Sequence, residues 1–310
     1  MAIARPPVWK IASILAVGTL AASTSAIIIR FAFAAADVQG AGFSLVLAAS
    51  RLTVASLMLL PAWRSFRGTS PTPQAIGFSV AAGLFLAVHF ATWISSLSYT
   101  SVAASTSLVT TNPIWVALIS WIWFKEKPAI ATLVGIGFAI TGSLVITIAD
   151  AGTGGTGINP PLGNALALIG SIAVSIHFLL GRQAQRLGLS VTNHIVVTYA
   201  TAALGLLPLP FLFGASYTSY SSTVYLCIAL MAIFPQLVGH TSFNWAVRWI
   251  SPTLVALTIL AEPVGSGLLA FILFQENPGG LVILGGVIIL MGVAIAALGA
   301  TQQPPSSAEL

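Results

Sequence analysis

The chain has 310 residues, of which 57% are hydrophobic and only 5% are charged, and its formal net charge is +5. A soluble domain carries about a quarter charged residues, so this composition excludes an ordinary water-soluble protein and indicates a chain embedded in a lipid bilayer. The basic residues are scattered over short loops without a clustered patch, and we therefore expect no nucleic-acid partner.

Long apolar stretches follow one another along the whole chain, and each approaches or exceeds the ~20 residues that a helix needs to cross a bilayer. They lie at about 10–29, 42–61, 75–97, 102–124, 129–148, 162–181, 192–213, 223–245, 252–274 and 279–299. Backbone groups in lipid must be satisfied internally, and the stretches lack the two-residue alternation of barrel strands. The sequence therefore predicts an all-α integral membrane protein with ten transmembrane helices.

The polar segments divide these stretches into two units. Residues 1–150 hold the first five stretches, residues 151–160 form a Gly-rich linker, and residues 161–300 hold the other five. Residues 301–310 are polar and Pro-rich, so we expect a disordered tail. No segment can house a soluble nucleotide-binding domain and no GxxxxGK[ST] motif occurs, so ATP-driven transport by this chain alone is not expected.

The fourth and ninth stretches end in the same pattern, 150 residues apart. The matching residues are Pro113 and Pro263, Phe124 and Phe274, Glu126 and Glu276, and Pro128 and Pro278. Lys125 and Lys127 of the first copy become Gln275 and Asn277 in the second. A duplicated segment that loses its Lys residues in one copy is what two oppositely oriented halves need. Inverted repeats built around broken helices are a signature of secondary transporters.

The distribution of Lys and Arg predicts the orientation, because cytoplasmic loops carry an excess of positive charge. With the N-terminus in the cytoplasm, nine of the eleven basic residues fall on cytoplasmic segments: Arg5, Lys10, Arg64, Arg67, Lys125, Lys127, Arg182, Arg186 and Arg248. We therefore expect both termini to be cytoplasmic and the second half to run inverted relative to the first.

These motifs carry a family resemblance that covers nearly the whole chain. Residues 51–60 (RLTVASLMLL), the Glu262-Pro263 element and the paired Phe-x-Glu-x-Pro turns resemble the EamA family of the drug/metabolite transporter superfamily. Within that family, the chain is most similar to the YddG-type exporters of aromatic amino acids and paraquat. The resemblance implies a solute exporter in a bacterial inner membrane, with a central cavity between two inverted five-helix repeats.

Two ionisable residues lie deep within predicted helices, where a charge is costly and marks a functional site. Arg51 and Glu262 are each about ten residues from a cytoplasmic helix end, which is roughly 15 Å at 1.5 Å per residue. Equal depth and opposite charge predict a pair that couples transport or binds substrate. Alternatively, Glu262 braces the kink at Pro263 while Arg51 extends toward the membrane surface. Asn112 takes the place of Glu262 in the other repeat, so the two kinks differ chemically.

Further polar and aromatic side chains are predicted to line the cavity. His89, Trp93 and Ser96 share one helix face by their i, i+4, i+7 spacing, and His240 and Asn244 share another. The predicted substrate contacts are His89, Trp93, Ser96, Tyr99, Asn112, Trp115, His177, His240, Asn244 and Glu262. For any one His, the alternative is an interhelical hydrogen bond within the bundle. The plainer stretches at 42–61, 129–148, 192–213 and 279–299 are expected to form an outer shell.

Other classes of function lack their motifs. The His residues do not have metal-ligand spacing such as HExxH, so no metal or cofactor is expected. No Asp lies in a predicted span, as an intramembrane prenyl transferase would require, and Ser266 between its two glycines lacks the nucleophile-elbow pattern. We therefore expect a transporter and not an enzyme. A channel or an intramembrane enzyme is the alternative class, and substrate counterflow separates a carrier from a channel.

The predicted lining bounds the substrate. One acid, one base and several His and Trp residues suit an aromatic amino acid or a related flat solute. An organic cation is the alternative substrate for the same fold. Nucleotide sugars would call for clustered Lys and Arg around their two phosphates, and no such cluster is present.

Overall fold

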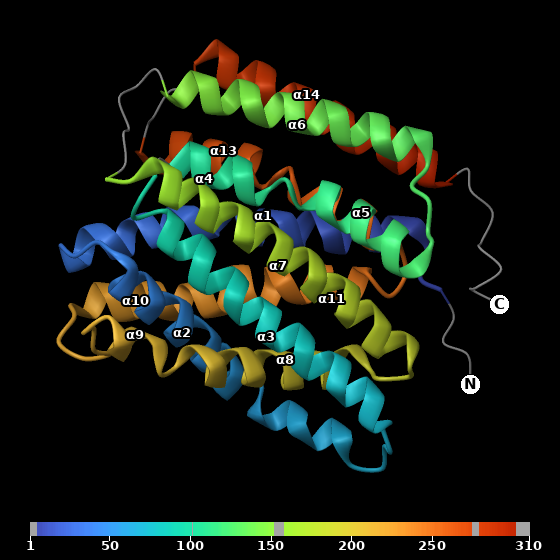
Figure 1. Cartoon of the computed structure of the whole chain (residues 1–310), viewed down its shortest axis with the longest axis horizontal. Helices are drawn as coiled ribbons and strands as arrows, with labels where there is room; N and C mark the ends of the chain where they lie inside the picture. The colour runs from blue at the N-terminus through green and yellow to red at the C-terminus, as the bar shows by residue number, and fades with distance from the viewer. Residues whose placement is uncertain (1–4, 101, 152–157, 275–278, 302–310) are drawn as a thin grey trace.

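The structure, a computed structural model of the chain, describes residues 5–100, 102–151, 158–274 and 279–301. All regular secondary structure within these residues is helical, which confirms the all-α prediction (Figure 1). The first part forms α1 (Val8–Ala36), α2 (Ala41–Met58), η1 (Leu60–Phe66), α3 (Pro73–Ser96), α4 (Val102–Val109), α5 (Asn112–Phe124) and α6 (Ile130–Ala151). The second part forms α7 (Pro160–Arg186), α8 (Val191–Leu206), α9 (Leu209–Leu212), α10 (Ser222–Met231), η2 (Ala232–His240), α11 (Thr241–Ala246), α12 (Pro252–Ile259), α13 (Glu262–Phe274) and α14 (Gly280–Thr301).

Length and composition mark many of these helices as membrane spans. Seven helical stretches in the described part of the chain are long and apolar enough to cross a bilayer, and shorter apolar helices accompany them. Every apolar stretch of the sequence overlaps one helix or a run of consecutive helices. The protein is therefore a multi-pass membrane protein, and the count of ten crossings stays a prediction.

α6 and α14 lie side by side along one edge of the bundle, and glycines bring their backbones into contact (Figure 1). A Cβ atom at Gly135 would lie 2.6 Å from the carbonyl oxygen of Gly292, and one at Gly142 would lie 2.5 Å from that of Gly285. Small residues let membrane helices approach closely enough for van der Waals contact to hold them together. A larger side chain at either position would push the two helices apart.

Two apolar stretches break near their middle. α4 gives way to α5 at Thr110–Thr111, and α12 gives way to α13 at Leu260–Ala261. Pro113 and Pro263 occupy the second position of the new helices, where the missing backbone N–H of proline would leave a carbonyl of the preceding turn without its partner. N–H groups at each break bond three residues back instead of four. The prolines of the sequence repeat therefore produce two matching breaks.

A third irregularity lies between α10 and α11, where Ala232–His240 wind as the π-helix η2 around Pro235. The ring of a proline clashes with the carbonyl four residues back in regular α-geometry. The wider π-turn keeps the segment helical. Such turns are rare in proteins, and those that do occur are often found at functional sites. The sequence predicted one regular helix over 223–245, so the π-helix is a difference from that prediction.

The packing brings the irregular helices to the centre of the bundle. α3 packs against α7 and α8, while α1 packs against α10, η2 and α13. α7 also contacts both α4 and α5, on either side of the first break. The breaks and the π-helix therefore face the same central region, contributed by both parts of the chain.

Candidate functional site

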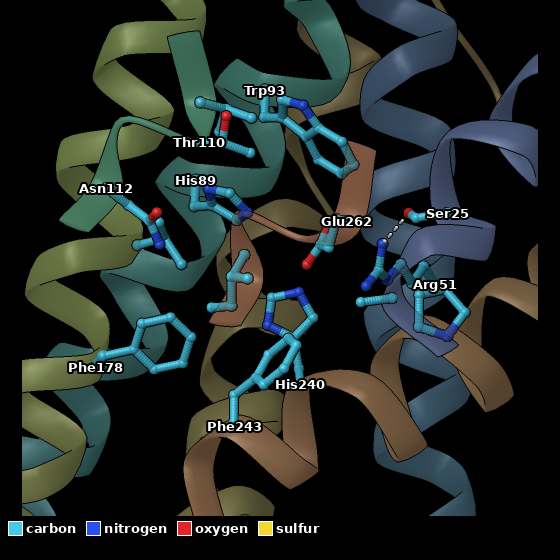
Figure 2. Close-up of a pocket in the computed structure, with 15 residues that line it drawn as sticks. Ser25, Arg51, His89, Trp93, Thr110, Asn112, Phe178, His240, Phe243 and Glu262 are labelled. Carbon is cyan, nitrogen blue, oxygen red and sulfur yellow. Dashed lines mark hydrogen bonds between the residues drawn. The ribbon is translucent and has the colours of Figure 1, made fainter. Parts of the chain in front are cut away.

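A pocket with about 470 Å³ of empty space, part of it open to the surroundings, lies in this central region (Figure 2). Both helix breaks and the π-helix contribute to its wall. Its lining residues are Ala22, Ser25, Arg51, His89, Trp93, Val109, Thr110, Asn112, Val174, Phe178, Pro235, His240, Phe243, Ile259 and Glu262. The wall combines one fixed cation, one carboxyl group, two imidazoles and several aromatic rings. Such a mixture suits a small amphipathic molecule.

Arg51 on α2 is fully buried and held by neutral groups. Its Nε donates to Oε1 of Gln236 at 2.9 Å, and its Nη1 donates to Oγ of Ser25 at 3.0 Å. The guanidinium carbon lies 4.2 Å from the centroid of the Phe90 ring, a cation–π contact. Three helices therefore fix the direction of this side chain. The contact to Gln236 depends on the π-helix, which carries that residue.

Glu262 is the first residue of α13, where the positive end of the helix dipole favours a carboxylate. Its carboxyl group points into the pocket on the side of Arg51 (Figure 2). The two side chains interact electrostatically, but their N and O atoms are farther apart than the 4.0 Å limit for an ion pair. The predicted pair therefore shares one pocket without direct contact.

His89 on α3 presents a hydrogen-bond acceptor to the pocket. Its Nδ1 lies 2.9 Å from the carbonyl oxygen of Gly170, and only a protonated nitrogen can bond to a carbonyl. In the neutral ring, Nε2 is then left with a lone pair. The ring stacks on Trp93, with centroids 5.8 Å apart and planes at 9°. The i, i+4 pattern predicted this shared face, and both residues lie at the pocket.

Several buried polar atoms of the pocket wall have no hydrogen-bond partner among the described residues. They are Nε1 of Trp93, Oδ1 of Asn112 and Nδ1 of His240. A buried polar group without a partner is costly, and it calls for an explanation such as a ligand or water. Their gathering around one pocket gives the pocket unused capacity to bind polar groups.

The other predicted contacts lie away from this pocket and bond to neighbouring groups. Oγ of Ser96 lies 2.6 Å from Oγ of Ser105 on α4, and Nε1 of Trp115 donates to Oγ1 of Thr111 at 3.2 Å. Tyr99 follows α3 and is partly exposed. Ser96 and Trp115 therefore fit the alternative of interhelical or local hydrogen bonds.

His177 and Asn244 belong to a second buried group, which we call the His–Asn cluster: Ser79, His177, His194 and Asn244. Asn244 Nδ2 lies 3.4 Å from His177 Nε2, and Asn244 Oδ1 lies 3.2 Å from His194 Nε2. Nδ1 of His177 lies 3.0 Å from the carbonyl oxygen of Ala82, and Nδ1 of His194 lies 2.9 Å from Oγ of Ser79. Every ring nitrogen of the cluster is therefore paired.

His194 was missed by sequence reasoning. It lies on α8, which was expected to be part of the outer shell, yet His194 and Tyr199 are completely buried. α8 packs against both α2 and α3. The signal was present in the sequence, because His194 and Thr198 are four residues apart and share a polar face on an apolar helix.

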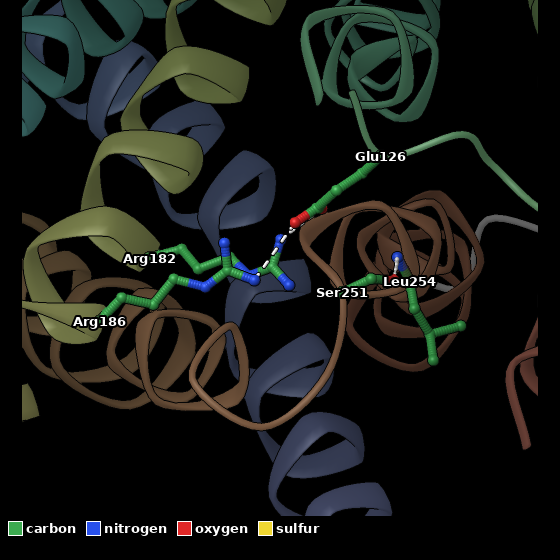
Figure 3. A network of polar contacts seen from close by, with 5 residues as sticks. All are labelled: Glu126, Arg182, Arg186, Ser251 and Leu254. Carbon is green, nitrogen blue, oxygen red and sulfur yellow. Dashed lines mark hydrogen bonds and ion pairs between the residues drawn. The ribbon is translucent and has the colours of Figure 1, made fainter. Parts of the chain in front are cut away.

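Glu126, in the turn after α5, joins the end of α7 through two ion pairs (Figure 3). Its Oε2 lies 2.6 Å from Nη1 of Arg182, and its Oε1 lies 3.2 Å from Nη2 of Arg186. These contacts tie α5 to α7 beyond the pocket. The repeat equivalent, Glu276, lies outside the described residues.

Within the described residues, no group of three or more His, Cys, Asp and Glu side chains could hold a metal ion.

Comparisons with known proteins agree with this architecture. A family model described as the EamA-like transporter family matches residues 9–148 and 161–298. An uncharacterized transporter of Archaeoglobus fulgidus is 26% identical over 204 residues, which cover 64% of this chain and 68% of the relative. The uncharacterized transporter YyaM of Bacillus subtilis is 26% identical over 212 residues, which cover 64% of this chain and 66% of the relative. A solved crystal structure with 22% identity matches 95% of this chain and 98% of its own with a TM-score of 0.73, which supports the fold alone.

Proposed function

Because this chain belongs to the EamA-like transporter family, we propose that it is a secondary transporter that exports small amphipathic metabolites across a bacterial inner membrane. The preferred substrates are aromatic amino acids and related flat solutes, in line with the resemblance to YddG-type exporters. Transport proceeds by alternating access of the central pocket to the two sides of the membrane. The relatives named above are described as uncharacterized transporters, which is in keeping with this class.

The observation that carries the proposal is the composition of the pocket wall. Trp93, Phe178 and Phe243 offer faces or edges for a flat ring. Arg51 and Glu262 offer both charges for a zwitterion. Glu262 begins α13 directly after a helix break, and such a placement is typical of sites in secondary transporters.

We further propose ten crossings arranged as two inverted five-helix repeats. The repeat aligns Gly135 with Gly285 and Gly142 with Gly292, whereas the contacts between α6 and α14 join Gly135 to Gly292 and Gly142 to Gly285. This exchange of equivalent residues is the pattern of contacts across a two-fold axis. The N-terminal end of α1 and the C-terminal end of α14 also lie at one end of the bundle, as an even number of crossings requires (Figure 1).

The proposed orientation is tested with single cysteines in a Cys227→Ala background. Ser70, between η1 and α3, and Thr218, between α9 and α10, are both exposed and lie on opposite sides in the proposed topology. An impermeant maleimide added to whole cells should label Thr218→Cys, whereas Ser70→Cys should react only after lysis. The reverse pattern would contradict the cytoplasmic placement of both termini.

The transport activity is tested with purified protein in liposomes. We expect saturable counterflow of labelled phenylalanine or tryptophan, because a carrier exchanges substrate across a closed membrane. Protein-free liposomes and a Leu204→Ala variant, which changes an exposed residue outside the pocket lining, serve as controls. Dissipation of the gradient without exchange or saturation would indicate a channel.

An organic-cation exporter is the second candidate, favoured by the carboxyl group of Glu262 in an aromatic pocket. Cations stack on aromatic rings and pair with carboxylates, so such a solute would fit the same wall. Counterflow of paraquat, with no exchange of aromatic amino acids, would select this candidate.

A further inference from the structure

Arg51 has more hydrogen-bond donors than the protein uses. A guanidinium has five N–H donors in a planar fork. One bond from Nε to Gln236 and one from Nη1 to Ser25 are the hydrogen bonds of this side chain within the described residues. Both partners are neutral, so the cation has hydrogen bonds but no anion in contact. The remaining donors belong to a side chain that lines the pocket.

Glu262 offers a carboxyl group to the same pocket without contacting Arg51. Figure 2 shows the two groups on one side of the pocket, across from Asn112 and Phe178. A charge inside a low-dielectric bundle is costly unless it is paired and hydrogen-bonded. A ligand that carries a carboxylate beside an ammonium can pair with both residues at once. An α-amino acid carries these two charges on neighbouring atoms.

We propose that Arg51 is the carboxylate anchor of the pocket and that Glu262 receives the α-ammonium group, so that the substrate must be a free α-amino acid. This inference rests on the proposed function and specifies the substrate class of the same site. Arg51 is suited to the role because its fork can bind both oxygens of a carboxylate. Ser25, Gln236 and Phe90 are positioning residues, since they fix the direction of the guanidinium before the substrate arrives.

The rest of the pocket wall is left for the amino-acid side chain. Trp93, His89 and Phe178 contribute rings to this wall, and Val109 and Val174 contribute aliphatic groups. Unused polar atoms nearby, including the lone pair of His89 Nε2, can accept a hydrogen bond from an indole N–H or a phenol O–H. The orientation therefore has the charged groups at α2 and α13 and the ring at α3 and α7.

The inference is tested with ligands that lack one charge each. Phenylalanine, phenethylamine and 3-phenylpropanoate share a ring but carry both charges, the ammonium only, or the carboxylate only. Competition against labelled phenylalanine counterflow should rank phenylalanine at least about tenfold above either analogue, because a lost charged hydrogen bond weakens binding by about that factor or more. Phenethylamine that competes as well as phenylalanine would overturn the carboxylate anchor.

Two variants should each remove the preference that depends on one charge. Arg51→Met removes the charge but keeps an apolar stem, and it should lower affinity for phenylalanine at least about tenfold while leaving phenethylamine affinity within about twofold. Glu262→Gln should lower the affinity for phenethylamine and leave the affinity for 3-phenylpropanoate unchanged. Equal losses for all three ligands in both variants would show that these residues do not read the charges.

A thermal-shift measurement in detergent keeps the test valid for a variant that transports poorly. Each folded variant should still be stabilised by the analogue whose charge partner remains. Ser25→Ala is the matched control for positioning. It should lower the affinities for phenylalanine and 3-phenylpropanoate by a similar factor and leave the affinity for phenethylamine unchanged. If wild-type protein exchanges no aromatic solute at all, the proposed function fails. If it exchanges phenylalanine and phenethylamine equally, only this inference fails.

Discussion

Two groups of buried His and Asn side chains lie in this bundle, and they differ in how fully their hydrogen bonds are made. In the His–Asn cluster, Asn244 bridges His177 and His194, and every ring nitrogen has a partner. In the pocket, Oδ1 of Asn112 and Nδ1 of His240 have none among the described residues. The same residue types thus brace helices in one region and leave binding capacity in the other.

The comparison teaches that residue type alone does not identify a site in a membrane bundle. A paired polar group links helices, because leaving it unpaired in an apolar interior is costly. An unpaired polar group at a pocket can form a hydrogen bond with a bound solute. The difference predicts opposite responses to similar substitutions, in stability for the cluster and in transport for the pocket.

The largest effect is expected from removing the bridge of the His–Asn cluster. Asn244→Leu leaves buried nitrogens of His177 and His194 without partners, and it should lower the free energy of unfolding by about 2–5 kcal/mol. Asn112→Leu is the matched control in the pocket, and it should cost less than about 1 kcal/mol because its Oδ1 has no partner to lose. Chemical unfolding in detergent micelles measures both. Equal losses would remove the distinction between the two regions.

A smaller loss of stability is expected when the cluster is crowded. A Cβ atom at Gly181 would lie 2.8 Å from Nε2 of His194 and 3.4 Å from Oδ1 of Asn244. Gly181→Ala should therefore destabilise the protein by about 1–3 kcal/mol, as overpacking does. Gly77→Ala, where a Cβ would meet nothing within 4 Å, should be neutral or slightly stabilising. The same unfolding experiment measures both variants. An unchanged free energy of unfolding for Gly181→Ala would contradict the tight packing.

In the pocket, the loss should appear in transport instead. Glu262→Gln keeps the shape of the side chain but removes its charge, so counterflow of phenylalanine should fall at least about tenfold with little change in unfolding. Because no ion pair joins Glu262 to Arg51, adding Glu262→Gln should rescue an Arg51→Leu variant only slightly. Normal transport by Glu262→Gln would assign this residue to bracing the break at Pro263.

The smallest effect is expected at the ring that stacks with His89. Trp93→Ala should weaken aromatic substrates about two- to tenfold more than a short aliphatic one, since aromatic contacts add about 0.5–1.5 kcal/mol beyond area burial. Trp115→Ala is the control, because Trp115 bonds to Thr111 and lies outside the pocket lining. Competition in counterflow measures the loss of affinity for the aromatic substrate relative to that for the aliphatic one. A similar ratio for both variants would indicate a packing role for Trp93.

The sequence was sufficient for features that depend on local chemistry. Long apolar stretches predicted helices because the backbone must bond to itself in lipid. The repeated Pro113 and Pro263 predicted interrupted helices, because proline lacks a donor wherever it lies. Helical spacing placed His89 and Trp93 on one face, and both lie at the pocket. The roles of these two residues in binding stay predictions.

The tertiary structure decided which polar residues have partners, because many of those partners come from other helices. Ser96, Trp115 and Asn244 carried the same polar signal as Asn112, yet the first three bond to neighbours outside the pocket lining. His194 became central only through contacts to α3 and α11. The direction of Arg51 depends on Gln236, which the π-helix carries. A sequence determines what each side chain can bond to, whereas only the packing of helices determines what it meets.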